Sequence, residues 1–131
     1  MPDELRVSDV PGDVASVVDR LTAGPRDRGV EVFATSLHAA GARAAGLDLA
    51  DEVLLVFGDP AVGAALMQAD PRSGVDLPLR MLVWSQDGTT RLAHQDPTGL
   101  ADRYEVGSEQ ATPSELRGLL EHLVAEAARL R

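Results

Sequence analysis

Two hydrophobic patterns follow one another at the start of the chain. Leu5–Val10 has the length and apolar content of a short strand, and Pro11-Gly12 ends it. Asp13 is then expected to cap a helix. The helix is predicted because apolar residues recur at the i, i+3, i+4, i+7 spacing of one buried face, at Val14, Val17, Val18 and Leu21.

The next segment predicts a second strand and a short helix. Val30–Ala34 has the β-favouring composition of a strand. Thr35 or Ser36 is expected to cap the helix that follows, because both residue types are preferred at N-caps. This alanine-rich helix is expected to run through Ala45 and to end at Gly46.

A continuous apolar run then leads into a glycine turn. Val53–Phe57 is predicted to be a strand buried on both faces, because no polar residue interrupts it. Asp59 and Pro60 have the pattern of an N-cap followed by proline at the first helical position. They predict a helix that continues to about Ala69.

A β-hairpin is predicted in the second half of the chain. Leu79–Trp84 and Thr89–Gln95 flank Asp87-Gly88, a dipeptide that suits the positive φ angles of a two-residue turn. Asp96-Pro97 repeats the cap-and-proline pattern and predicts a short helix. Tyr104–Val106 is expected to be extended.

The last helix has the strongest start signal. Thr112-Pro113-Ser114-Glu115 is a capping box with proline in the first turn. Leucines line one face of the helix behind it, at Leu116, Leu119, Leu120, Leu123 and Leu130. The order of elements predicts one α+β domain over residues 1–131, with two layers: a mainly antiparallel sheet and helices packed on one face of it.

Composition excludes several kinds of chemistry. The 131 residues include no cysteine, and no lysine is present in the sequence, so disulfides, thiolate metal sites and Schiff bases are excluded. The net charge of −9 disfavours binding to nucleic acid or to an anionic membrane. No targeting segment or membrane span is apparent, so a cytoplasmic location is expected.

The glycine turn at the start of the third helix does not match a phosphate-binding loop. Gly58 and Gly63 have the spacing of the two P-loop glycines, but Ala64 and Ala65 stand where Lys and Ser or Thr are required. Asp59 is expected to hold the N-terminal amides of the helix itself, which leaves no place there for an anion.

Histidine and acidic residues offer few catalytic arrangements. His38 and Met67 are conceivable axial ligands of haem or copper, but core packing of Met67 is the preferred interpretation, and no metal site is expected. Ser36 and His38 are not expected to face each other as nucleophile and base. Asp70 and Asp76 are expected to lie in a solvated acidic loop.

The motifs taken together resemble a bacterial family, the domain of unknown function 302 family. The resemblance covers about residues 14 to 106 in the same order and spacing. It is carried by Val32-Phe33-Ala34 with His38 and Ala42, Val56 to Pro60, Gly63 to Met67, Asp76 to Arg80, Val83-Trp84, Asp87-Gly88 and Asp96-Pro97.

This resemblance implies a fold like that of the TATA-binding protein, β-α-β(4)-α with extra short helices, often paired as a dimer. It implies no particular activity. The sequence departs from the family pattern at Asp59, Ala64, Arg80 and His94, where asparagine, threonine, lysine and an aromatic residue are more usual. Any ligand role that the usual asparagine and threonine have is therefore in question in this chain.

The matched residues nominate a ligand-binding surface. We expect several of them to meet in one groove: His38, Gly58, Asp59, Gly63, Met67 and Asp76, with Pro78. The leading hypothesis is a non-enzymatic protein that binds a small molecule or a cofactor of unknown identity and acts as a homodimer. The alternatives are a protein–protein interaction module and, third, an acid/base enzyme that uses His38 with Asp59 or Asp76.

Overall fold

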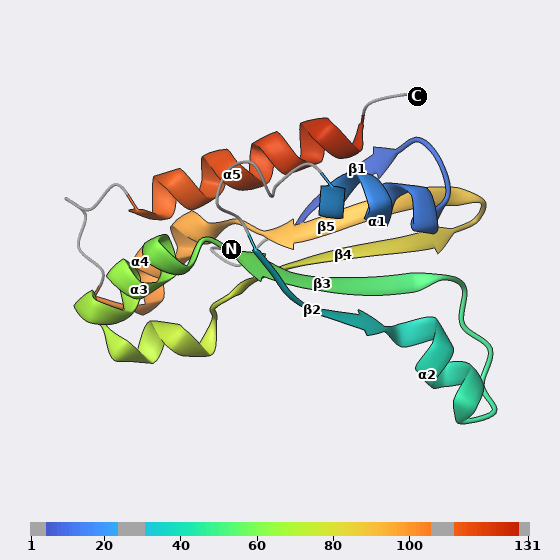
Figure 1. Cartoon of the computed structure of the whole chain (residues 1–131), viewed down its shortest axis with the longest axis horizontal. Coiled ribbons are helices and arrows are strands. Elements are labelled where there is room, and N and C mark those ends of the chain that lie inside the picture. Colours follow the sequence, from blue (N-terminus) through green and yellow to red (C-terminus); the bar gives the residue numbers. More distant parts are fainter. Residues whose placement is uncertain (1–4, 24–30, 106–111, 129–131) are drawn as a thin grey trace.

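One antiparallel sheet organises the computed structural model, which describes residues 5–23, 31–105 and 112–128 (Figure 1). Its strands lie in the order β1-β5-β4-β3-β2. They are β1 (Leu5–Val10), β2 (Glu31–Leu37), β3 (Glu52–Gly58), β4 (Leu79–Gln86) and β5 (Thr89–Gln95). This order makes β1 and β2 the two edges of the sheet. Every neighbouring pair of strands is antiparallel.

Two helices, α1 (Val14–Ala23) and α5 (Thr112–Ala127), cover one face of this sheet. The core between the two layers is built from residues of both, including Val17, Met81, Leu92 and Leu120. The predicted two-layer α+β fold and the β-α-β(4)-α order are confirmed. Within the described residues, no helix has both the length and the apolar character needed to cross a membrane.

The remaining helices are short and lie at the ends of the sheet. They are α2 (His38–Ala44), α3 (Pro60–Ala69), η2 (Pro71–Val75), η3 (Pro97–Gly99) and α4 (Leu100–Arg103). Figure 1 shows α3 and α4 together at one end, whereas α2 extends from the other end beyond β2 and β3.

The prediction that β3 is buried on both faces is wrong. Leu55 and Phe57 are 2% and 3% exposed, whereas Leu54 and Val56 on the other face are only half-buried. The reason is that the helices cover only one side of the sheet. A run of apolar residues therefore did not distinguish a doubly covered strand from one with an open apolar face.

The second strand is longer than predicted. Thr35 and Ser36 belong to β2, and α2 begins at His38 without a side-chain cap. Pairing with β3 continues through Leu37, which lies opposite Val53. Because this pairing supplies hydrogen bonds to the backbone of residues 35–37, the strand continues past the residues that were expected to cap the helix.

Several local predictions are confirmed. The hairpin turn has φ of 52° at Asp87 and 80° at Gly88, both in the left-handed region. Asp13 caps α1 through a 2.8 Å hydrogen bond that its Oδ1 accepts from the Ser16 amide. Tyr104 is extended but belongs to no strand. Val106, Leu130 and the side chains of the predicted capping box, Thr112 to Ser114, lie outside the described part of the chain.

Candidate functional site

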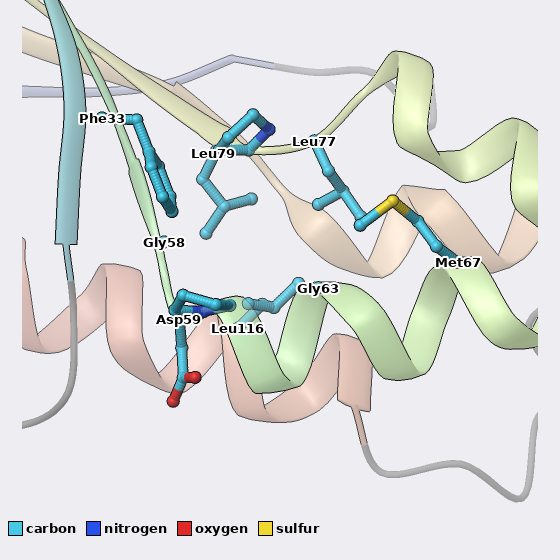
Figure 2. Close-up of a pocket in the computed structure, with 10 residues that line it drawn as sticks. Phe33, Gly58, Asp59, Gly63, Met67, Leu77, Leu79 and Leu116 are labelled. Atoms are coloured by element: carbon cyan, nitrogen blue, oxygen red, sulfur yellow. The ribbon is translucent and has the colours of Figure 1, made fainter.

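A cavity of about 220 Å³ opens where β3 ends and α3 begins (Figure 2). Its walls are mostly apolar and come from β2, α3, the segment before β4, and α5. The apolar side chains that line it include Phe33, Leu77, Leu79 and Leu116. Such a lining favours an uncharged, largely apolar ligand over an ion.

The structure brings most of the nominated residues to this cavity. Gly58, Asp59, Gly63, Met67 and Pro78 all line it. They meet because Gly58 ends β3, Asp59 and Gly63 belong to the start of α3, and Met67 follows Gly63 by one helical turn.

The two glycines leave space beside the apolar side chains. A Cβ atom at Gly58 would lie 3.8 Å from Cβ of Pro78 and 3.9 Å from Cε2 of Phe33, which is ordinary contact. A Cβ atom at Gly63 would lie 3.8 Å from Cε of Met67. Side chains at these two positions would therefore occupy part of the cavity without striking the backbone.

Asp59 caps α3 and does not offer an anion site. Its Oδ1 accepts a 3.0 Å hydrogen bond from the Ala61 amide. Figure 2 shows the carboxylate pointing away from the apolar side chains of the cavity. The predicted structural role of Asp59 is confirmed, and its negative charge opposes a phosphate at the start of this helix.

Met67 is not a core residue, contrary to the preferred interpretation of the sequence. It is 39% exposed and lies against Gly74 of η2, where an added Cβ would be 3.1 Å from its sulfur. The helical spacing of Met67 with Val62 and Leu66 suggested packing, but only Leu66 is fully buried. Met67 instead forms one side of the cavity.

The acidic residues beside the cavity hold its wall together. Asp76 Oδ2 accepts hydrogen bonds from the Tyr104 hydroxyl at 2.7 Å and from Arg103 Nε at 3.1 Å. The hydrogen bond to Asp76 raises the pKa of Tyr104 above its usual value. Asp76 does not line the cavity itself, but Leu77 and Pro78, which follow it directly, do.

Asp70 is also bound rather than solvated, so the prediction of a solvated acidic loop is wrong. Asp70 is 5% exposed, and its carboxylate accepts hydrogen bonds from the Arg72 side chain and from the Glu105 amide. The Arg72 guanidinium, followed by the Glu105 amide, holds the pKa of Asp70 well below its usual range. Local patterns did not predict the hydrogen bond between Asp70 and the Glu105 amide, because Glu105 is distant along the chain.

His38 lies outside the cavity. It is exposed at the start of α2, which extends from the other end of the sheet (Figure 1). Its Nδ1 lies 3.4 Å from Ser36 Oγ, so these two side chains do face each other, contrary to the prediction. The contact is longer than a good hydrogen bond, and no carboxylate in the described residues orients the ring.

No catalytic constellation accompanies the cavity within the described ranges. No contact joins His38 to Asp59 or Asp76, which bond to other groups, and His38 does not share the cavity with Met67. Among the residues that the structure describes, no cluster of three or more His, Asp or Glu residues could hold a metal ion.

Sequence reasoning missed part of the apolar lining. Phe33 lies at an irregularity in the pairing of β2 with β3, between Val32 and Ala34. This shift was not visible in the sequence, so Phe33 could not be assigned to a face. The patterns predict Leu79 as a strand residue and Leu116 as part of the leucine-lined face of the last helix, and neither pattern indicates a cavity.

Comparison with known proteins finds relatives that are much longer than this chain. The chain is 41% identical over 96 residues to proteins named fluoride-specific ion channel FluC 1 in Brucella suis and Brucella abortus. The matches cover 72% of this chain but 37% and 35% of those proteins. The chain therefore spans little more than a third of the length of the curated relatives it matches.

A solved structure and a family model match nearly the whole domain. The crystal structure of an uncharacterized conserved DUF302 protein from Bacillus stearothermophilus matches with a TM-score of 0.76 at 22% identity, covering 97% of this chain and 98% of that one. At that identity the likeness concerns the fold. The model of the domain of unknown function DUF302 matches residues 6–123. The protein is thus a member of the DUF302 family.

Proposed function

We propose that this protein is a non-enzymatic binding protein for a small, largely apolar molecule, and that it acts as a homodimer. The observation that carries the proposal is the cavity of about 220 Å³ between β2, α3 and α5. Its aromatic and aliphatic walls match the lining of ordinary small-molecule sites. Gly58, Asp59, Gly63 and Met67 are the proposed ligand-contacting residues, whereas His38 and Asp76 are not.

The proposed dimer forms through the edge strand β2. All residues of β2 are exposed, and Val32, Phe33 and Leu37 are 38%, 47% and 58% exposed. Between Glu31 and Leu37 this edge carries no charged residue, whereas the opposite edge, β1, carries Arg6 and Asp9. An uncharged apolar edge strand is suited to pairing with a second copy. Phe33 lies on this edge and in the cavity wall, so the second copy would lie beside the cavity mouth.

The test of ligand binding uses small apolar probes and nuclear magnetic resonance. Indole and toluene are suitable, because dry apolar cavities in proteins bind molecules of this kind. We expect saturable shifts of the Gly58 and Gly63 amides and of the Met67 methyl group, with Kd on the order of 1 mM.

Filling the cavity gives the matched control. Gly63→Leu places a side chain where the cavity lies, so saturable binding is expected to disappear. Gly41→Leu makes a comparable change in α2, where an added Cβ has no neighbour within 4 Å, and leaves binding intact. Equal probe binding by both variants, or no saturable shift in the unaltered protein, would refute the proposed ligand site.

The second candidate is an interaction module that docks on a partner protein. It is favoured by the similarity to a segment of longer Brucella chains that are named ion channels and by apolar side chains around α2, where Leu37 and Leu47 are 58% and 65% exposed. A photo-crosslinking residue at Leu47 distinguishes the two ideas in cells. An adduct of two copies of this chain supports the homodimer, whereas an adduct with a membrane channel supports the module.

A further inference from the structure

A second cavity, of about 260 Å³, lies between β1, the end of β5, and α5, and shares no lining residue with the first. Most of the residues that line it are polar or charged, whereas most of those that line the first are apolar. The polar residues that line it are Arg6, Ser8, His94, Asp96, Arg117 and Glu121. None of them entered the binding surface proposed above.

The topology explains why these residues meet. Arg6 of β1 lies directly opposite His94 of β5, and His94 lies opposite the core residue Met81 of β4. Opposed residues point to the same face of a sheet, so Arg6 and His94 lie on the face that α5 covers. Arg117 and Glu121 follow each other by one turn of α5.

His94 is a buried polar residue of this lining. The residue is 8% exposed, and its Nδ1 lies 3.0 Å from the Gln95 carbonyl oxygen. A carbonyl only accepts, so Nδ1 carries the hydrogen and Nε2 of the neutral ring has a lone pair. Nε2 has no partner among the described residues and is not shut off from solvent, so a ligand can reach it.

Donors for an anionic group lie on the same lining. Arg6 Nη2 donates to Asp96 Oδ2 at 3.1 Å, and Arg117 Nε donates to Glu121 Oε1 at 3.2 Å. The Arg117 interaction leaves both terminal nitrogens of that guanidinium for another acceptor. The planar pair of Nη donors matches the two oxygens of a carboxylate.

The balance of charge selects the class of ligand. Two arginines and two carboxylates line the cavity, so their formal charges cancel, and a ligand without net charge fits them better than an anion or a cation. We propose that this cavity binds a small zwitterion of the α-amino acid type. The ligand carboxylate accepts from Arg117 and Arg6, and its ammonium donates to His94 Nε2 and Ser8 Oγ. Val124 and Pro97 face the ligand side chain.

The test is a calorimetric titration of the full chain with L-valine at about pH 8. Saturable binding is expected. Isovalerate, which lacks the ammonium, and isobutylamine, which lacks the carboxylate, are each expected to bind at least about tenfold more weakly, the effect of losing one charge-assisted interaction.

Variants assign the binding to this cavity. His94→Phe and Arg117→Gln are each expected to weaken valine binding by about tenfold or more. Arg117 is an exposed surface residue, with a side chain 53% exposed, so Arg117→Gln keeps the fold even if His94→Phe does not. Arg43→Gln alters an arginine of similar exposure, 60%, on α2 and is expected to leave binding unchanged.

Three results would overturn the proposal. One is an absence of saturable heat with valine and also with glycine, a smaller zwitterion. The second is equal binding of valine and its two single-charge analogues. The third is valine binding that Arg117→Gln leaves unaltered. The apolar cavity is tested separately, because Gly63→Leu is expected to abolish indole binding without changing the valine titration.

Discussion

At the scale of single residues, Gly63 has opposite effects on the stability of α3 and on the space in the cavity. It lies inside α3, outside the left-handed region, and an added Cβ would meet only Cε of Met67 at 3.8 Å. Glycine in such a helical position is less favourable than alanine, because it loses more backbone entropy on folding. Compared with alanine, Gly63 therefore lowers the free energy of unfolding, but it leaves space in the cavity.

Gly63→Ala is expected to raise the free energy of unfolding by about 0.5–1 kcal/mol. The measurement is urea denaturation followed by circular dichroism. Gly41→Ala in α2, where an added Cβ has no neighbour within 4 Å, is the control. It measures the effect of helix propensity at a position that does not line the cavity. A loss of stability in Gly63→Ala beside a gain in Gly41→Ala would mean that the cavity wall cannot accept a methyl group.

Asp70 shows how one carboxylate fixes the short helix η2, which lies against Met67. It caps η2 through a 3.0 Å hydrogen bond from the Arg72 amide and binds the Arg72 guanidinium and the Glu105 amide. Because its pKa is lower in the folded chain than the ordinary 3.8, the folded state favours the ionised form. Its contribution to stability is therefore complete above about pH 4 and is lost as the pH falls below that value.

Asp70→Asn is expected to lower Tm by several degrees at neutral pH, because the ion pair with Arg72 is lost. The difference in Tm between the unaltered protein and the variant should shrink as the pH falls below about 4. Thermal unfolding between about pH 7 and pH 2.5 measures it. Asp48→Asn, at an exposed carboxylate, serves as control and should show little difference. A gap that stays constant with pH would contradict the assignment.

At the scale of elements, α1 and α5 are joined by more than apolar packing. Arg20 of α1 is 9% exposed, and its Nη2 donates to the Ala127 carbonyl at 2.8 Å and to the Pro11 carbonyl. It thereby satisfies a carbonyl at the end of α5 and the turn between β1 and α1. A charged residue next to Leu21 on the buried face was not predicted from the apolar spacing.

Arg20→Met is expected to reduce the free energy of unfolding by about 2–3 kcal/mol, because two charge-assisted hydrogen bonds to carbonyl oxygens, one buried and one partly buried, are lost. Urea denaturation measures this change. Arg43→Met is the control: its side chain is 60% exposed, and the expected change is within about 0.5 kcal/mol. An effect of Arg20→Met no larger than that of the control would show that packing alone holds α5 in place.

At the scale of the whole molecule, the helices cover one face of the sheet and leave β2 uncovered at its edge. The chain also carries a net charge of −9, which opposes non-specific association. Self-association therefore needs a specific uncharged surface, and residues 32–37 of β2 offer one.

Light scattering after gel filtration is expected to give twice the chain mass of 13.8 kDa. Leu37→Lys places a charge on the edge of β2 and is expected to give the monomer mass. Val75→Lys, at a residue that is 84% exposed on η2, is the control and should leave the dimer intact. A monomer in the unaltered protein, or a dimer in Leu37→Lys, would exclude the β2 interface.

The sequence by itself determined the local structure. Asp59-Pro60 fixed the start of α3, Asp87-Gly88 fixed the hairpin, and the spacing of Val14, Val17 and Leu21 fixed the buried face of α1. These features depend on hydrogen bonds and backbone angles within a few residues, so residue type and spacing were sufficient to predict them.

Only the tertiary structure decided which distant residues meet. It separated His38 from Gly58, placed Phe33 and Leu116 in the same cavity, and gathered His94 with Arg6 and Arg117 in a second one. Strand order, the pairing irregularity in β2 and the single covered face of the sheet set these contacts. They arise from long-range pairing and packing, which local patterns along the chain do not encode.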